Sequence, residues 1–166
     1  MNHNHHGSSQ KFEYIKFFGV MLLVATLASC HALWFGFGLM QFLESFMGSF
    51  FVVFSFFKFI NLKEFAYGFQ SYDLIARKSL FYSFSYPFMQ LALGLLYLFG
   101  QGTIYLDTFV LLISLISGIG VLNSLLKKQA VHCVCLGNVI KLPLSTISFV
   151  EDFGMALMAA AMIFLR

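Results

Sequence analysis

Two cysteines one residue apart, Cys133 and Cys135, are the residues of this chain best suited to chemistry, with His132 before them and Gly137 after them. A Cys-x-Cys pair can bind a soft ion such as Cu(I), and the neighbouring imidazole of His132 can serve as a third ligand. The same pair can instead close a small, strained disulfide of the labile kind that takes part in thiol–disulfide exchange. The spacing is compatible with both chemistries.

Two adjacent carboxylates, Glu151 and Asp152, follow the thiol pair at the start of the last apolar segment. They could accept a proton from a thiol or bind a metal ion. Alternatively, they could lie in the first helical turn, exposed to water, and complement the helix dipole. Because the thiol loop and the start of this helix should share one membrane face, we expect the carboxylates near the thiols.

A third thiol, Cys30, lies next to His31 inside the first apolar segment. A lone cysteine can resolve a mixed disulfide or pass on a metal ion, and it can equally be a small packing residue. An imidazole at this depth needs a partner. Three methionines, Met155, Met158 and Met162, share one face of the last helix. Their thioethers would suit copper, but the small residues around them favour helix packing.

Composition identifies an integral membrane protein. The chain has 166 residues, of which 60% are hydrophobic and 10% are charged, and its mean hydropathy is +0.85. A soluble domain has about 25% charged and about 45–50% apolar residues. No dense basic stretch indicates nucleic-acid binding, and three cysteines in so apolar a chain do not form a secreted disulfide framework.

The apolar segments predict an all-α, polytopic membrane helix bundle that forms a single domain over residues 11–166. Each crossing needs about 20 mostly apolar residues. For the last span we favour a start at Leu144, after Pro143, over a capping box at Ser148. Lys58 is expected to extend along the second span towards water. The expected spans are 17–37, 45–62, 80–99, 108–126 and 144–165.

The first ten residues contain His3, His5 and His6. We interpret residues 1–10 as a disordered tail that is either a native metal-collecting segment or a purification tag.

The distribution of lysine and arginine predicts the sidedness of the bundle. Nine of the ten basic residues lie at the amino terminus, between the second and third spans, or in the thiol loop, and Arg166 alone lies on the opposite side. The positive-inside rule therefore predicts a cytoplasmic amino terminus, a cytoplasmic Cys-x-Cys loop and an outer carboxyl terminus, in a bacterial inner membrane. Cytoplasmic thiols are kept reduced unless they are catalytic.

The order of several motifs resembles the MauE/DoxX-like family of redox-associated membrane proteins over residues 46–165. These motifs are Lys58 or Lys63 before Phe65-Ala66, then Tyr72 with Leu74, Tyr86-Pro87-Phe88, Leu91-Gly94-Leu95, Cys133-x-Cys135-x-Gly137 and Pro143-x-Ser145. The resemblance implies a four-helix membrane bundle connected with thiol–disulfide chemistry, to which the first helix would be an addition. By the same resemblance, Cys133 and Cys135 would be the redox pair. MauE itself is linked to the maturation of a disulfide-rich methylamine dehydrogenase subunit.

Three functional hypotheses follow. In the first, Cys133 and Cys135 exchange a disulfide with a thioredoxin-like protein or pass electrons to a quinone, and His132, Glu151 or Asp152 adjusts the thiolate. In the second, Cys133, Cys135 and His132 bind copper, mercury or zinc from a metal donor. Cys30-His31 would then lie deeper on the path of the metal ion across the membrane. In the third, the chain is a structural or assembly subunit whose thiols stabilise a complex. The small residues of the last helix could contact other helices of the chain or a second copy, as in a homo-oligomer. No resident cofactor can be read from the residues.

Overall fold

The computed structural model describes the backbone of residues 5–36, 38–126 and 144–166, and their side chains except at 5–14, 72, 124–125 and 144–151. These residues contain no strand. They form a short 3-10 turn, η1 (Ala76–Lys78), and six α-helices: α1 (His5–Phe35), α2 (Leu39–Ile60), α3 (Leu62–Tyr72), α4 (Leu80–Leu98), α5 (Ile104–Leu126) and α6 (Leu144–Leu165). The all-helical class expected from the sequence is confirmed.

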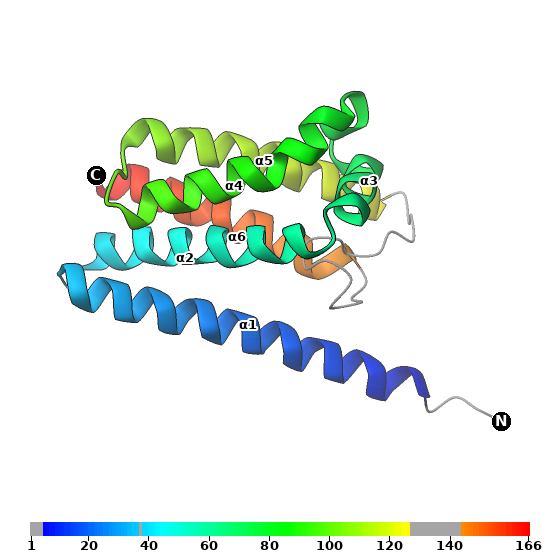
Figure 1. Ribbon diagram of the computed structural model, residues 1–166, viewed down its shortest axis with the longest axis horizontal. Helices are drawn as coiled ribbons and strands as arrows, with labels where there is room; N and C mark the ends of the chain where they lie inside the picture. The colour runs from blue at the N-terminus through cyan, green and yellow to red at the C-terminus, as the bar shows by residue number, and fades with distance from the viewer. Residues whose placement is uncertain (1–4, 37, 127–143) are drawn as a thin grey trace.

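The long helices run along one common direction, and α3 lies at one end of them (Figure 1). Helices α2 and α4 pack as one antiparallel pair, α5 and α6 pack as another, and α1 packs chiefly against α2. We call the end where α2 and α5 finish and α4 and α6 begin the α3 end. The opposite end, which holds the turn after α1, the turn between α4 and α5, and Arg166, is the C-terminal end (Figure 1).

Three of the described helices are long and apolar enough to cross a membrane, over Ile15–Phe35, Leu39–Ile60 and Ile104–Asn123. The expected spans 80–99 and 144–165 correspond to α4 and α6, which are not among these three. Helix α6 begins at Leu144, the earlier of the two starts considered. Helix α1 begins at His5, inside the segment from 1 to 10 that we expected to be a disordered tail.

The sequence pattern does not predict α3, because the charged residues of this stretch indicate a polar connection between the second and third spans. Its 11 residues are amphipathic: Phe65 and Phe69 are buried, while Lys63, Glu64 and Tyr67 are exposed. Residues four apart lie on the same face of a helix, so the two rings pack together against the bundle. They stack on each other, Phe65 also stacks on Tyr86 of α4, and Phe69 contacts the same ring in a tilted arrangement.

Aromatic and methionine side chains fill the main core. Phe50 and Phe54 of α2 stack with ring centroids 4.2 Å apart. Met155 and Met162 are buried in the same cluster, and Met158 packs against it. The methionine face of α6 is therefore a packing surface, as the small residues around it predicted.

Helices α2 and α4 approach closely at Gly48 and Gly94. A Cβ atom on Gly48 would lie 3.0 Å from the carbonyl oxygen of Gly94, and one on Gly94 would lie 3.0 Å from the carbonyl oxygen of Gly48. Small residues at a helix crossing allow this approach between membrane helices. The two glycines therefore set the distance between the helices of this pair.

We predict that Gly48→Ala and Gly94→Ala each destabilise the bundle by about 1–3 kcal/mol, because the added methyl group overpacks a backbone contact. Gly154→Ala in α6 is the matched control, since no atom lies within 4 Å of its added Cβ. Alanine also favours the helix there by up to about 1 kcal/mol. Thermal unfolding in detergent should show lower midpoints for the first two variants only. Equal midpoints for all three would contradict this account.

Candidate functional site

A lysine is buried at the α3 end of the bundle. The residue Lys58, near the end of α2, is only 4% exposed, and its Nζ donates a hydrogen bond to Gln90 Oε1 of α4 at 2.5 Å. The same ammonium group lies 5.1 Å from the ring centroid of Phe65 and 4.9 Å from that of Tyr86. The expectation that Lys58 extends towards water is wrong. Helix α3 covers it, and the amide and the aromatic faces replace the water.

One of the two predicted carboxylates joins this region. Asp152 of α6 is half-buried and accepts a hydrogen bond from Ser117 Oγ of α5 at 3.2 Å. It also interacts electrostatically with the Lys58 ammonium group. We call Lys58, Gln90, Ser117 and Asp152 the α3-end cluster. It draws on four helices and places a cation, a carboxylate and a hydroxyl inside an apolar bundle.

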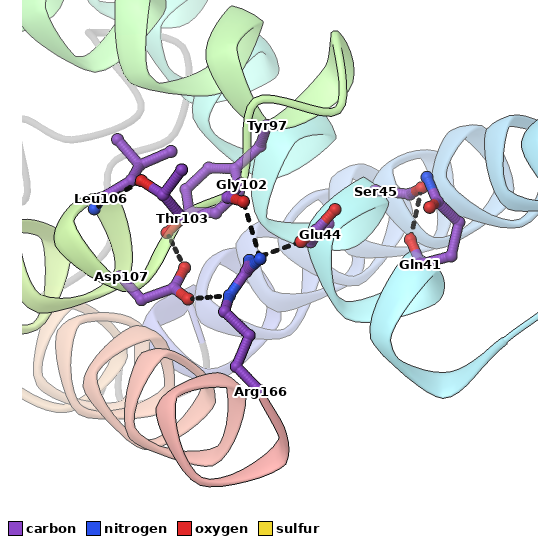
Figure 2. A network of polar contacts seen from close by, with 9 residues as sticks. All are labelled: Gln41, Glu44, Ser45, Tyr97, Gly102, Thr103, Leu106, Asp107 and Arg166. Carbon is purple, nitrogen blue, oxygen red and sulfur yellow. Dashed lines mark hydrogen bonds and ion pairs between the residues drawn. The ribbon is translucent and has the colours of Figure 1, made fainter.

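A second polar network lies at the C-terminal end (Figure 2). The guanidinium of Arg166 donates from Nε to Asp107 Oδ2 at 2.9 Å, from Nη2 to Glu44 Oε1 at 2.5 Å and from Nη1 to the Gly102 carbonyl at 2.6 Å. Tyr97 donates its hydroxyl proton to Asp107 Oδ1 at 2.9 Å. One side chain thus connects the end of α6 to α2 and α5, and through Asp107 to α4.

The sequence pattern does not predict either group as a whole. Each joins residues far apart in the chain, as in the pairing of Glu44 with Arg166. A signal was present, because alternating helix directions bring the start of α2, the start of α5 and the end of α6 to the same end of the bundle. Ionisable residues of opposite charge at such matching positions are expected to pair within a membrane bundle.

Cys30 and His31 lie near the end of α1 at Phe35. Helix α1 ends at the C-terminal end of the bundle (Figure 1), whereas Asp152 lies in the half of α6 nearer the α3 end. The imidazole has the partner that its depth requires: His31 Nδ1 lies 2.9 Å from Ser45 Oγ, and the ring contacts that of Phe35 at 4.6 Å between centroids. Cys30 is exposed on the outside of the helix and carries a free thiol. Neither residue joins the α3-end cluster.

The loop residues His132, Cys133 and Cys135, and the side chain of Glu151, lie outside the described residues. The helix before this segment ends at Leu126 and the helix after it begins at Leu144, both at the α3 end (Figure 1). Within the part of the chain that the structure describes, no group of three or more His, Cys, Asp or Glu residues could hold a metal ion.

The fold defines an integral membrane protein, a helical bundle that encloses a cluster of polar side chains towards each of its two ends. The model of the family "Methylamine utilisation protein MauE" matches residues 37–165, and the chain belongs to this family. The resemblance derived from the sequence is confirmed, and the match begins just after α1 ends at Phe35. No curated protein and no solved structure matches the chain.

We predict that Arg166→Gln lowers stability by about 3–5 kcal/mol, because it leaves the fully buried Asp107 without its cation. Arg166→Lys should restore only part of the loss, since an ammonium group lacks the planar fork that reaches both carboxylates. The exposed Arg77, which bonds the Ser71 carbonyl, supplies the control Arg77→Gln. Thermal unfolding of the purified variants measures the difference. If Arg166→Gln melts at the same temperature as the control, the network does not stabilise the bundle.

Proposed function

We propose that this protein is a membrane thiol–disulfide redox protein that uses Cys133 and Cys135 as its redox pair. One observation carries the proposal: the buried cation Lys58 and the half-buried carboxylate Asp152 lie in the half of the bundle nearer the α3 end, and α5 ends and α6 begins at that end. The chain between these two helices contains both thiols. Membership of the MauE family also supports it, because the resemblance to redox-associated membrane proteins implies that Cys133 and Cys135 are a redox pair.

The proposed chemistry is reversible exchange. A thiolate of the pair attacks one sulfur of a partner's disulfide, forms a mixed disulfide and releases the other partner sulfur as a thiolate. The second thiolate of the pair then attacks the mixed disulfide, closes the Cys133–Cys135 bond and releases the second partner thiolate. Two electrons pass from the pair to the partner. The reverse sequence oxidises a dithiol of the partner.

The α3-end cluster supports this chemistry through its charges. A nearby cation lowers the pKa of a cysteine and increases the fraction of reactive thiolate. Lys58 supplies such a charge in an apolar surrounding, where electrostatic interactions extend further than in water. Asp152 can accept or return a proton, and we propose that His132 and Glu151 assist it. Cys30 takes no part, because it lies on α1 near the C-terminal end.

The proposed partner is a thioredoxin-like protein, or a protein of methylamine utilisation whose disulfides must be formed correctly. The second suggestion rests on the description of the family alone. The alternative functions are assembly without thiol exchange and binding of a soft metal ion by the same thiols. A redox titration distinguishes them from exchange.

We predict that the purified protein shows a reversible two-electron thiol couple when it is titrated against thioredoxin in a defined redox buffer. Cys133→Ser and Cys135→Ser should each abolish the couple, whereas Cys30→Ser should leave it unchanged. Counting free thiols at each potential measures the effect. Stoichiometric Cu(I) binding that is lost in the loop variants, together with no exchange with thioredoxin, would overturn the redox function in favour of metal handling. Neither exchange nor Cu(I) binding would favour an assembly role.

We further propose that the protein lies in the bacterial inner membrane with its amino terminus and its thiol loop in the cytoplasm, since the basic residues gather on that side. In a Cys30→Ser background, a membrane-impermeant thiol reagent should label Cys133 and Cys135 only after intact cells are opened. A cysteine placed after Arg166 should react in intact cells. Labelling of the loop from outside would reverse the proposed orientation.

A further inference from the structure

A pocket lies between α1 and the rest of the bundle. Helix α1 packs chiefly against α2, and the two helices diverge towards the start of α1 (Figure 1). The pocket has a volume of about 240 Å³, and α6 forms its third wall. Its lining is apolar and includes Phe17 and Met21 of α1, Phe46 and Phe50 of α2, and Gly154 and Met158 of α6.

The volume and the lining of this pocket suit a hydrocarbon chain. An apolar cavity of roughly 150 Å³ stays free of water and holds benzene, which has six carbon atoms. By the same proportion, a pocket of 240 Å³ holds about ten carbon atoms. Left empty, the pocket would deprive the side chains around it of van der Waals contacts. A long alkyl chain fills such a space better than a small rigid molecule does.

The pocket extends from near one membrane surface to the middle of the membrane. Phe17 lies two residues after Ile15, where the candidate span of α1 begins. Gly154 lies ten residues after the start of α6 at Leu144 and eleven before its end at Leu165. In a hydrocarbon core about 30 Å thick, Gly154 is therefore near the midplane. The acyl chain of a phospholipid follows the same course, from the headgroup to the middle of the bilayer.

A basic side chain lies beside the surface end of the pocket. Lys16 directly precedes Phe17, is half-buried and lies in the first turn of the span. Val20, four residues later and thus on the same face of α1, packs against the main core. A lysine on this face can extend its ammonium group to the phosphate of a lipid. The three charged residues of α1, Lys11, Glu13 and Lys16, sum to +1, which favours an anionic headgroup.

We propose that this pocket binds one anionic phospholipid from the leaflet at the α3 end, with an acyl chain between α1 and α6 and the phosphate beside Lys16. The bound chain attaches α1 to α6, in addition to the direct contact of α1 with α2. The lipid thereby stabilises the docking of the helix that precedes the matched family region. The inference does not depend on the thiol chemistry, so the Cys133→Ser/Cys135→Ser protein should bind the lipid with unchanged affinity.

Titration of phosphatidylglycerol into the purified full-length protein in detergent tests the site, and native mass spectrometry counts the bound lipids. We expect one molecule to bind more tightly than the rest and to raise the midpoint of thermal unfolding. Phosphatidylcholine with the same acyl chains should bind about fivefold more weakly, because its headgroup has no net negative charge. Equal affinity for the two lipids, or no tightly bound lipid at all, would overturn the proposal.

Gly154→Leu fills the pocket near the membrane midplane. No atom lies within 4 Å of the added Cβ, so the variant should fold, and its unfolding midpoint without lipid checks this. Gly19→Leu is the matched control, because its Cβ also meets no atom within 4 Å and Gly19 is exposed outside the pocket. We expect only Gly154→Leu to lose the tightly bound phosphatidylglycerol. Equal binding by the two variants would show lipid that merely surrounds the bundle and would overturn the site.

Lys16→Gln tests the headgroup without changing the pocket. It should weaken phosphatidylglycerol binding about fivefold and remove the preference over phosphatidylcholine. Lys63→Gln, at an exposed lysine of α3, is the control and should bind like the unaltered protein. Unchanged binding by Lys16→Gln would overturn the assigned headgroup position. A homodimer whose cross-links join α1 of one copy to α6 of the other would overturn the site, because a second copy would then occupy the pocket.

Discussion

In a chain this apolar, a buried charge must find its partner inside the bundle, and the arrangement of the helices depends on this requirement. Arg166 illustrates it most clearly, because it bonds two carboxylates and a carbonyl that come from different parts of the chain. The bonds join the end of α6 to α2, to the start of α5 and to the turn between α4 and α5, and no short turn connects α6 to any of these. Exchanging the position of any of these helices would leave a carboxylate or a guanidinium in the hydrocarbon without its partner, at a cost of several kcal/mol.

Between the two ends of the bundle, the helices are held together by close packing rather than by paired charges. In lipid, apolar side chains gain little by leaving the hydrocarbon, so close contact between helices stabilises the bundle instead. Gly48 and Gly94 bring α2 and α4 together, and stacked rings such as Phe50 and Phe54 fill the space towards α6. The polar groups decide which helices meet, and the small residues and rings decide how closely they meet.

The sequence predicted what depends on local pattern. The helical class, the start of α6 after Pro143 and the family all followed from apolar runs, a proline and short motifs. It did not predict α3, because an amphipathic helix of 11 residues is too short to register as a span. That omission produced the error at Lys58, since only α3 and α4 together supply the rings and the amide that replace water.

The C-terminal network was missed for a different reason. Glu44, Asp107 and Arg166 are each ordinary helix-end residues, and only their meeting in space gives them a role. For the thiol pair, residue types and spacing predict thiol–disulfide exchange or soft-metal binding, and this stays a prediction.

Helix α1 has a consequence for how the family can vary. It ends at Phe35, just before the matched region begins, and it touches the bundle chiefly through α2. A chain without this helix would keep the four-helix core intact, yet its first residue would emerge on the opposite side of the membrane. One additional membrane-spanning helix therefore moves the amino terminus to the other side of the membrane without changing the core. Whether a domain fused to the amino terminus lies inside or outside therefore depends on whether the chain has an odd or an even number of membrane-spanning helices.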